Sequence, residues 1–418
     1  MEEKKSRWGV ITAFSLVAAA TQMIWLTFTP LTTVAAQRYG VSATAIGWLA
    51  NVFVLVFVVL AIPSGFLVSR HLRGGLLLGA VITAAGACLR LAGDSFSWML
   101  IGGLVAALGQ PLVLTGIIGI ARGYLRPGHR PAGIAAATAS TWAGYVAAFM
   151  LSAFFSKAGS LPALVAVDAA FAVIAAVALT FALRGPIPFA GPQARDITRS
   201  SLAAVRSAWG NPVIRKLCVF AFIPFGTFIA LTTWTQALLD PAGVSVGQVG
   251  IILTICVLAG VAGTVVIPVL AARRHKEIRT GVAGIVVTAA GCVVLALVPG
   301  FGTALVSLAL AGLLLLPVLA IILELVERTS GDADGVTAGL VWTMGTLGGL
   351  VITGVVGFTL NSPTVSFLIL AAVALLGLPL LARLRHPVAN MAPADVQAES
   401  AAPAEPAASR VAASRARA

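Results

Sequence analysis

The feature that most constrains this chain is a succession of twelve apolar runs, each about twenty residues or longer. Hydrocarbon offers no hydrogen bonds, so a segment that crosses it must pair its own backbone groups, as a helix does. Hydrophobic residues make up 59% of the 418 positions and charged residues only 10%, which leaves too little charged surface for a soluble protein. The sequence therefore predicts an all-α membrane protein with helices at residues 10–34, 44–69, 75–93, 98–121, 132–154, 162–183, 215–238, 248–271, 280–298, 303–325, 336–358 and 363–384.

Basic residues follow an alternating pattern along the connections between these runs. The chain has a net charge of +13, and all but three of its 27 lysines and arginines lie in every second connection or near the termini. The three exceptions are Arg38, Arg90 and Lys157. Because basic loops remain in the cytoplasm, we expect a multi-pass protein of the plasma membrane with both termini cytoplasmic. The expected partner of this positive charge is the lipid bilayer and not a nucleic acid.

The first six runs and the last six resemble one another. Residues that recur at similar spacing are Pro63 and Pro268, Pro111 and Pro317, and Trp142 and Trp342, which are 205, 206 and 200 positions apart. Proline is tolerated inside a membrane helix where a neighbouring helix or a cavity satisfies the freed carbonyl. One unit used twice is typical of transporters that rock about a site near the middle of the membrane.

The longest internal connection lies between the sixth and seventh runs and is polar and basic. It predicts four parts of the chain. These are an N-terminal six-helix bundle at 1–185, a cytoplasmic linker at 186–212, a C-terminal six-helix bundle at 213–386 and a disordered cytoplasmic tail at 387–418. A monomer is expected.

The chemistry of the sequence separates three classes of function. All four cysteines lie inside apolar runs without metal-ligand spacing. No phosphate-binding glycine loop and no nucleophile–base pair is found within a run, so we expect no metal, no cofactor and no enzymatic activity. A receptor or sensor usually carries a folded output domain, for which these loops and this tail are too short. The sequence therefore favours a transporter of a small organic solute.

Several polar and aromatic residues lie deep within the predicted spans. Gln22, Trp25 and Thr29 have the i, i+3, i+7 spacing of one helical face. Polar side chains are costly against lipid, so this face is expected to point at a cavity or at another helix. Trp142 and Gln110 also lie far from the membrane interfaces. An indole face attracts a quaternary ammonium group, although packing between helices would also account for these residues.

The connection between the second and third runs, Gly65–Gly74, has a glycine, a spacer, and then arginines before a second glycine. It resembles the signature loop of the major facilitator superfamily, which implies the major facilitator fold with two six-helix bundles. In that family an acidic residue and the arginines latch the two halves on the cytoplasmic side. Ser69 occupies the acidic position here, so the latch is expected to be weaker or to use another acid. We assign Arg70, Arg73 and Glu324 to it.

Three further regions carry a narrower resemblance. They are Ser15–Val17 with Gln22, Trp25, Tyr39–Val41 and Ile46–Leu49; Gly109–Pro111; and Leu316–Pro317 with Glu324 and Gly339–Leu340. Together they resemble the feline leukaemia virus subgroup C receptor-related family of facilitators, most clearly in the first four runs. Members of that family are associated with choline and ethanolamine, with pyridoxine in one branch, and with haem.

The resemblance implies particular binding residues. Trp25 and Gln110 match the family's tryptophan and glutamine. A family tyrosine falls on Ile229, directly after Phe228, and a second glutamine falls on Thr346. The resemblance thus implies a choline-like substrate bound near Trp25, Gln110, Phe228 and Thr346, and the two departures put the identity of the substrate in doubt more than the fold.

The position of ionisable residues bears on how transport is driven. Arg90 and Asp168 lie toward the outer ends of their runs, and no Asp, Glu, His or Lys lies in the middle third of any run. A proton or sodium coupler usually has such a group there. The sequence therefore favours facilitated diffusion by alternating access, with a proton-coupled importer or exporter of another small metabolite or drug as the alternative.

Overall fold

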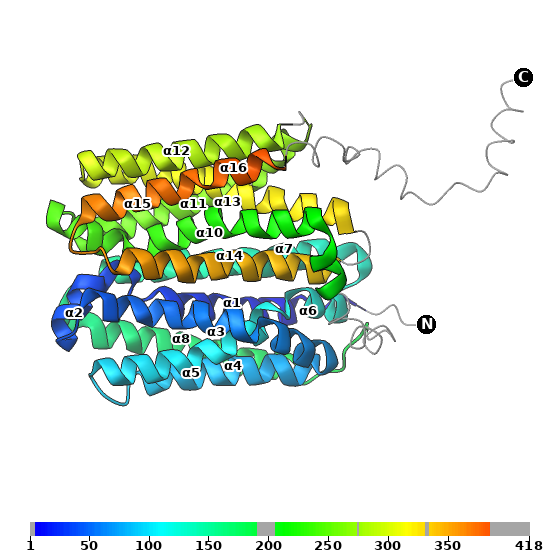
Figure 1. Cartoon of the computed structure of the whole chain (residues 1–418). Coiled ribbons are helices and arrows are strands. Elements are labelled where there is room, and N and C mark those ends of the chain that lie inside the picture. The colour runs from blue at the N-terminus through cyan, green and yellow to red at the C-terminus, as the bar shows by residue number, and fades with distance from the viewer. Residues whose placement is uncertain (1–4, 190–204, 274–275, 331–333, 385–418) are drawn as a thin grey trace, which may run out of the picture.

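The computed structural model describes residues 5–189, 205–273, 276–330 and 334–384, and helices dominate them (Figure 1). Twelve helical segments in these residues are long and apolar enough to cross a membrane, which confirms the predicted number of spans. No strand occurs in the described part of the chain. The protein is therefore all-α, as its hydropathy predicts.

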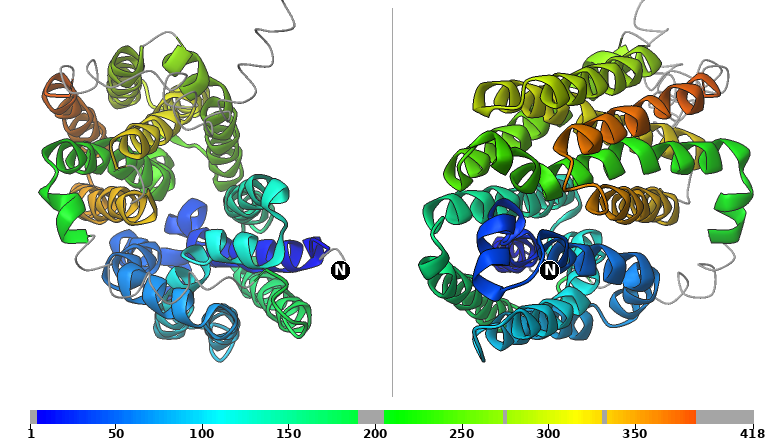
Figure 2. Two further views of the ribbon diagram at one scale, coloured as in Figure 1. Left: turned by 90° about the vertical axis from the view of Figure 1, so that its right-hand side faces the viewer. Right: turned by 60° about the vertical axis from the view of Figure 1, so that its left-hand side comes forward.

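The helices form two groups along the chain. The N-terminal half contains α1 (Trp8–Leu26), the 3₁₀ turn η1 (Thr29–Leu31), α2 (Thr32–Tyr39), α3 (Ala43–Arg70), α4 (Leu72–Leu89), α5 (Phe96–Leu114), α6 (Ile117–Tyr124), α7 (Arg130–Phe154), the 3₁₀ turn η3 (Ala158–Ser160) and α8 (Leu161–Ala182). The C-terminal half contains α10 (Pro212–Leu239), α11 (Val246–Arg273), α12 (Glu277–Leu297), α13 (Phe301–Ser330), α14 (Asp334–Gly357), α15 (Pro363–Leu375) and α16 (Gly377–Ala382). Figure 2 shows the two groups end-on as separate sets of ribbons.

Packing within the two halves follows the same plan. In the N-terminal half α1 packs against α7, α4 against α5, and α3 against α5. In the C-terminal half the corresponding pairs are α10 with α14, α12 with α13, and α11 with α13. Between the halves α3 packs against α14 and α7 against α11, which are equivalent pairs under the same correspondence. The arrangement agrees with the repeat suggested by the matched prolines. All four lie inside helices, Pro63 and Pro268 in α3 and α11, and Pro111 and Pro317 in α5 and α13.

The domain boundaries expected from the sequence are only partly described. Most of the expected linker at 186–212 falls at residues 190–204, and the expected tail at 387–418 falls in 385–418, all outside the described residues. The last residues before this gap contact the N-terminal half, because Ile187 packs against its apolar core and the Phe189 N–H donates to the carbonyl of Gly123.

The first membrane span is not the single helix over 10–34 that its hydropathy predicts. It ends as an α-helix at Leu26 and continues through η1 into α2. Pro30 explains the break, since its ring has no N–H for the carbonyl of Leu26 and collides with that carbonyl in a regular helix. The last span is divided in the same way, because α15 ends at Leu375, four residues before Pro379.

Glycines allow the central helices of each half to cross with their backbones nearly touching. A Cβ on Gly144 of α7 would lie 2.4 Å from the carbonyl oxygen of Ala19 in α1. A Cβ on Gly348 of α14 would lie 2.0 Å from the carbonyl oxygen of Phe222 in α10. Such distances are far inside van der Waals contact, so only glycine fits. The two glycines are 204 positions apart and occupy equivalent crossings.

We therefore expect Gly348→Val to lower the stability of the C-terminal half by about 1–3 kcal/mol or more, because the backbones of α10 and α14 must separate. Gly354 on the same helix is a matched control, since a Cβ there would meet nothing within 4 Å. The measurement is thermal unfolding of the purified variants in detergent. Equal melting temperatures for Gly348→Val and Gly354→Val would contradict the close crossing.

Candidate functional site

An aromatic cluster of Trp25, Trp142 and Tyr145 lies where α1 meets α7. The ring centroid of Tyr145 is 5.6 Å from that of Trp25, with an interplanar angle of 80°, and 5.2 Å from that of Trp142. Tyr145 is buried, whereas both tryptophans are half-buried. Tyr145 also belongs to an apolar cluster that includes Phe228 of the C-terminal half. The aromatic cluster is therefore part of the junction between the two halves.

Two contacts hold the aromatic cluster in place. The indole N–H of Trp25 donates to the carbonyl oxygen of Ala50 in α3 at 3.0 Å, which fixes the plane of the ring. The missing side chain at Gly144 lets α7 approach Gln22, because a Cβ there would lie 2.9 Å from the Gln22 Cβ. The close crossing of α1 and α7 thus brings Trp25 and Tyr145 into edge-to-face contact, a favourable geometry for aromatic rings.

Tyr145 was missing from the residues singled out by sequence. It follows Trp142 by three positions and so shares its helical face. That spacing was a usable signal, but tyrosine in an apolar run is less conspicuous than tryptophan or glutamine.

The polar residues expected beside Trp25 have different surroundings. Gln22 is buried, and its Nε2 donates to the hydroxyl of Thr21. Thr29 does not continue the face of Gln22 and Trp25, since α1 ends at Leu26 and Thr29 begins η1. Its buried hydroxyl has no hydrogen-bond partner in the described structure. The i, i+7 spacing argument for Thr29 is therefore wrong, because it assumes an unbroken helix.

Gln110 on α5 is also buried, and its Nε2 has no hydrogen-bond partner among the described residues. An unsatisfied buried amide is costly and is a common mark of a missing ligand or water.

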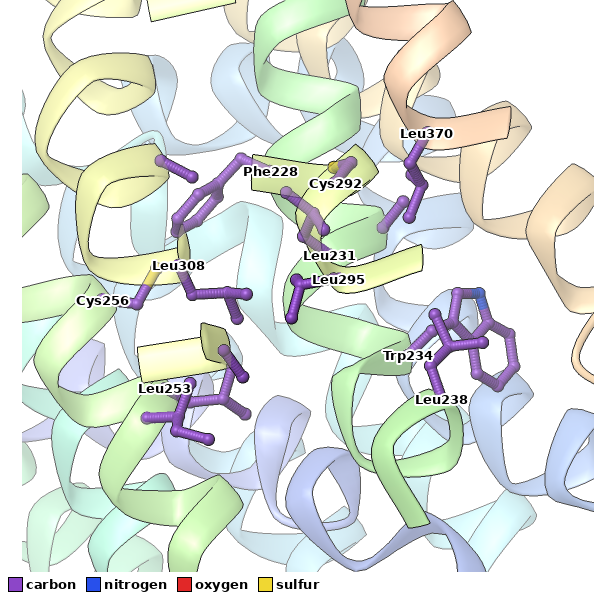
Figure 3. Close-up of a cluster of buried hydrophobic side chains, with 14 of the residues drawn as sticks. Phe228, Leu231, Trp234, Leu238, Leu253, Cys256, Cys292, Leu295, Leu308 and Leu370 are labelled. Carbon is purple, nitrogen blue, oxygen red and sulfur yellow. The ribbon is translucent and has the colours of Figure 1, made fainter. Parts of the chain in front are cut away.

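The two candidates in the C-terminal half are Phe228 of α10 and Thr346 of α14. Phe228 is 2% exposed and belongs to the same buried apolar cluster as Cys256 and Leu308, as Figure 3 shows. The hydroxyl of Thr346 donates to the carbonyl of Trp342 one helical turn earlier, at 2.7 Å. Thr346 is therefore hydrogen-bonded within its own helix.

The crossing of α10 and α14 has different side chains from the equivalent crossing of α1 and α7. Trp342 packs edge-on against Phe225, with 5.2 Å between ring centroids. Where the N-terminal half places Tyr145 against Trp25, the residues 204 positions later are Gly349 and Ile229. They too are in contact, because a Cβ on Gly349 would lie 2.5 Å from the Ile229 Cδ1.

Two of the residues assigned to the latch lie close to the turn between α3 and α4, namely Arg70 at the end of α3 and Arg73 near the start of α4, whereas Glu324 belongs to α13. Arg73 is committed to its own half, since its Nε donates to the hydroxyl of Tyr124 at 3.1 Å and its Nη2 donates to the carbonyl of Gly185. Arg70 is exposed and Glu324 is half-buried. The latch between these residues stays a prediction.

We call the end of the molecule at which α1 begins and α3 ends the basic side, and the opposite end the sealed side. Hydrogen bonds join the two halves at the sealed side. The amide N–H of Thr33 donates to Oε1 of Gln236 at 2.7 Å, and Nε2 of Gln236 donates to the hydroxyl of Thr33 at 2.7 Å. The hydroxyl of Thr44 donates to the carbonyl of Gly357 at 3.2 Å.

Trp234 of α10 closes the sealed side against α3. A Cβ on Gly47 would lie 2.0 Å from Cη2 of the Trp234 ring, so the indole lies directly on the bare backbone of α3. The indole N–H donates to the carbonyl of Thr353 at 2.9 Å, and the hydroxyl of Thr353 contacts Oδ1 of Asn51 at 2.9 Å. Trp234 is 1% exposed. We call Gly47, Asn51, Trp234 and Thr353, with the Thr33–Gln236 pair, the seal.

Within the described residues, no group of three or more His, Cys, Asp or Glu side chains is placed to hold a metal ion.

Comparison with known proteins identifies the family. A sequence profile described as the Major Facilitator Superfamily matches residues 11–353. The chain belongs to this superfamily. The protein is accordingly a membrane transporter of the major facilitator superfamily and not an enzyme, and the predicted fold class is confirmed.

Curated relatives of this facilitator are distant. It is 27% identical over 114 residues to the human choline/ethanolamine transporter FLVCR2, a match that covers 26% of this chain and 22% of that protein. It is 24% identical over 374 residues to solute carrier family 49 member A3 of Xenopus tropicalis, covering 83% of this chain and 76% of that protein. The match to the human transporter therefore spans only about a fifth of that protein's length.

Solved structures share the facilitator fold at low identity. A bacterial homologue of the human lysosomal transporter Spinster, in an inward-facing and unoccupied conformation, superposes with a TM-score of 0.74 at 15% identity, covering 92% of this chain and 97% of that chain. The nucleoside transporter NupG superposes with a TM-score of 0.73 at 15% identity, covering 90% and 99%.

The seal gives a direct test in this facilitator. We expect Gly47→Val to force α3 and α10 apart, because its Cβ overlaps the Trp234 ring, and so to open the sealed side. Spin labels on Lys157 and Leu297, which are exposed at that side in different halves, would report a longer separation. Cys88 is exposed and is replaced by serine so that only the chosen positions are labelled.

Gly302→Val is the matched control, since a Cβ on Gly302 at the same side meets nothing within 4 Å. Adding Trp234→Ala to Gly47→Val should restore the shorter separation. An unchanged separation in Gly47→Val would show that the contact does not hold the halves together.

Proposed function

We propose that this protein carries a small organic solute across the membrane by alternating access, and that the described conformation is closed at the sealed side and open toward the basic side. Cross-half hydrogen bonds at Thr33, Thr44 and Thr353 support the closure. The basic residues where α3 ends and where α7 and α10 begin support a cytoplasmic location for the basic side and for both termini. The plasma membrane is the proposed location.

We propose a choline-like organic cation as the solute, bound at the aromatic cluster. The observation that carries this proposal is the convergence of three electron-rich rings, Trp25, Trp142 and Tyr145, at the junction of the halves. A cation over such rings gains about 2 kcal/mol or more when it is desolvated, without a carboxylate partner. The name of the human relative, a choline/ethanolamine transporter, points to the same class of solute.

In the C-terminal half, the proposed site differs from the pattern of binding residues that the family resemblance implies. Ile229 and Thr346 supply neither the tyrosine nor the glutamine that the family resemblance implies. The hydroxyl of Thr346 also donates its proton to the carbonyl of Trp342 in its own helix. The proposed site therefore recognises its solute mainly by cation–π attraction to the rings of the N-terminal half, with few polar contacts to a hydroxyl group.

The substitution series at Trp25 tests this binding mode. We expect Trp25→Ala to weaken choline binding about 30-fold, the equivalent of about 2 kcal/mol, because the cation loses an indole face. Trp25→Phe should weaken it less, since a ring remains but the hydrogen bond to Ala50 is lost. The measurement is calorimetric or scintillation-proximity binding with purified protein.

Trp98, on α5 and outside the aromatic cluster, is 38% exposed and provides the matched controls Trp98→Ala and Trp98→Phe. These variants should bind choline as the wild type does. A wild-type protein that binds no quaternary amine would end the proposal for this solute class, leaving the broader assignment as a superfamily transporter.

We propose further that transport is facilitative. Purified protein in vesicles should let labelled choline reach the same concentration inside as outside, with or without an imposed pH gradient at zero membrane potential. The physical reason is that the aromatic cluster contains no group that gains or loses a proton near neutral pH. Accumulation that follows the pH gradient would instead favour the proton-coupled alternative. Vesicles without protein are the control for passive leakage.

A further inference from the structure

A buried carboxyl and a buried guanidinium lie inside the N-terminal half and take no part in the proposed solute site. Asp168 of α8 and Arg90 at the end of α4 are each 1% exposed. They are not paired with each other, and the ion pair found among the described residues joins Arg38 to Asp94. Arg90 instead donates from Nη1 to the carbonyl of Ile24 at 3.1 Å. Within the described parts of the chain, neither the Nε of Arg90 nor Oδ1 of Asp168 has a hydrogen-bond partner.

The other carboxyl oxygen of Asp168 contacts the hydroxyl of Thr27. That hydroxyl lies 2.8 Å from the carbonyl oxygen of Met23 and in close contact with Oδ2 of Asp168. A threonine hydroxyl has one proton to donate. If Asp168 is protonated, it donates to Thr27 and Thr27 donates to Met23, so both contacts contain a proton. If Asp168 is ionised, the single hydroxyl proton of Thr27 can serve only one of the two contacts, either with Met23 or with Asp168. The other pair of oxygens then has no proton between them, and the buried carboxylate has at most one hydrogen-bond donor.

The charged and titratable groups around Asp168 are few. Among the described residues, α1, η3 and α5 contain no ionisable side chain. The helix α4 contains Arg73 near its first residue and the exposed Cys88 near its last, and Arg90 directly follows it. Tyr39 of α2 interacts with Arg90. Asp168 is therefore placed next to one cation that can stabilise its ionised form, and that cation is held by Ile24 in this conformation.

Thr27 connects Asp168 to the seal along the chain. It lies at the break of the first span, two residues before η1 begins, and its carbonyl accepts a hydrogen bond from the hydroxyl of Ser152 at 2.8 Å. The turn η1 packs against α10 and α11 of the C-terminal half. Two residues after η1, Thr33 forms its pair with Gln236. A change at Thr27 thus acts on the segment that closes the sealed side.

We propose that Asp168 is a proton-binding site whose occupancy favours the sealed conformation, so that pH sets the balance between the two conformations of the carrier. The proposal rests on the alternating-access mechanism proposed above. Opening the sealed side separates η1 from α10 and α11, water reaches the end of α8, and Asp168 releases its proton to that water and ionises beside Arg90.

The sign of the effect follows from this linkage. The sealed conformation is the one that binds the proton, so it is favoured at low pH and is lost as pH rises. A single proton bound by one conformation only changes their ratio by up to about tenfold per pH unit. The proton is not required to cross with the solute, so pH would tune the carrier without driving accumulation.

The test measures the separation of spin labels on Lys157 and Leu297, in the Cys88→Ser background, without solute and with the same pH on both sides of a lipid nanodisc. As the pH is raised from about 4, where a hydrated aspartate begins to ionise, to about 7, the wild type should lose its short-distance population, by up to about tenfold per unit. Asp168→Asn should keep the short distance throughout, because it mimics the protonated carboxyl. Asp168→Glu should recover a pH response.

Asp94→Asn is the matched control, because Asp94 is an exposed carboxyl at the same side and should leave the response unchanged. Thr27→Val, which removes the hydroxyl partner, should reduce the response even if Asp168→Asn fails to fold. A wild type that does not respond to pH, or an Asp168→Asn variant that responds as the wild type does, would overturn the proposal. Choline binding at one fixed pH tests the solute site independently, so failure of one proposal is distinguishable from failure of the other.

Discussion

Hydrocarbon cannot form hydrogen bonds with the backbone groups that a broken helix leaves unpaired, so the protein itself must supply partners for them. The break in the first membrane span shows how it does so. Pro30 ends the α-helix early, and side chains from other helices then bond to the backbone around the break. Arg90 donates to the carbonyl of Ile24, and Ser152 donates to that of Thr27. These contacts tie α1 to the end of α4 and to α7. They bury polar groups that a continuous helix would not have needed, and they fix where η1 meets the other half.

Close backbone approach is the second device that organises the molecule, and it is used at two levels. Gly144 and Gly348 allow the central helices within each half to touch, and Gly47 allows the six-membered ring of Trp234 to touch the backbone of α3 between the halves. Dispersion contacts grow rapidly as surfaces approach, so glycine at a crossing gives strong packing in a medium where the hydrophobic effect cannot drive helix association. Close packing against glycine therefore stabilises each half and also holds the two halves together at the sealed side.

The sequence was sufficient for the number of spans and for the repeat, because apolar length and in-span prolines are local properties. It was insufficient where a side chain's role depends on its neighbours. The spacing argument for Thr29 assumed one unbroken helix, and Pro30 interrupts that helix. Thr346 is polar, as a binding residue would be, but its hydroxyl donates a hydrogen bond to the carbonyl of Trp342. Tyr145 could have been included from its spacing to Trp142, whereas its contact with Trp25 required the α1–α7 crossing.

The contrast between Tyr145 on Trp25 and Gly349 on Ile229 makes the two halves chemically unequal at equivalent crossings. In the proposed binding mode, a cation bound by the rings contacts mainly the N-terminal half. It therefore stays bound to that half while the C-terminal half moves relative to it. The rings then contribute almost the same affinity whichever side is open. A ligand held equally in both conformations does not bias their populations, so such a carrier would exchange its solute at comparable concentrations on the two faces of the membrane.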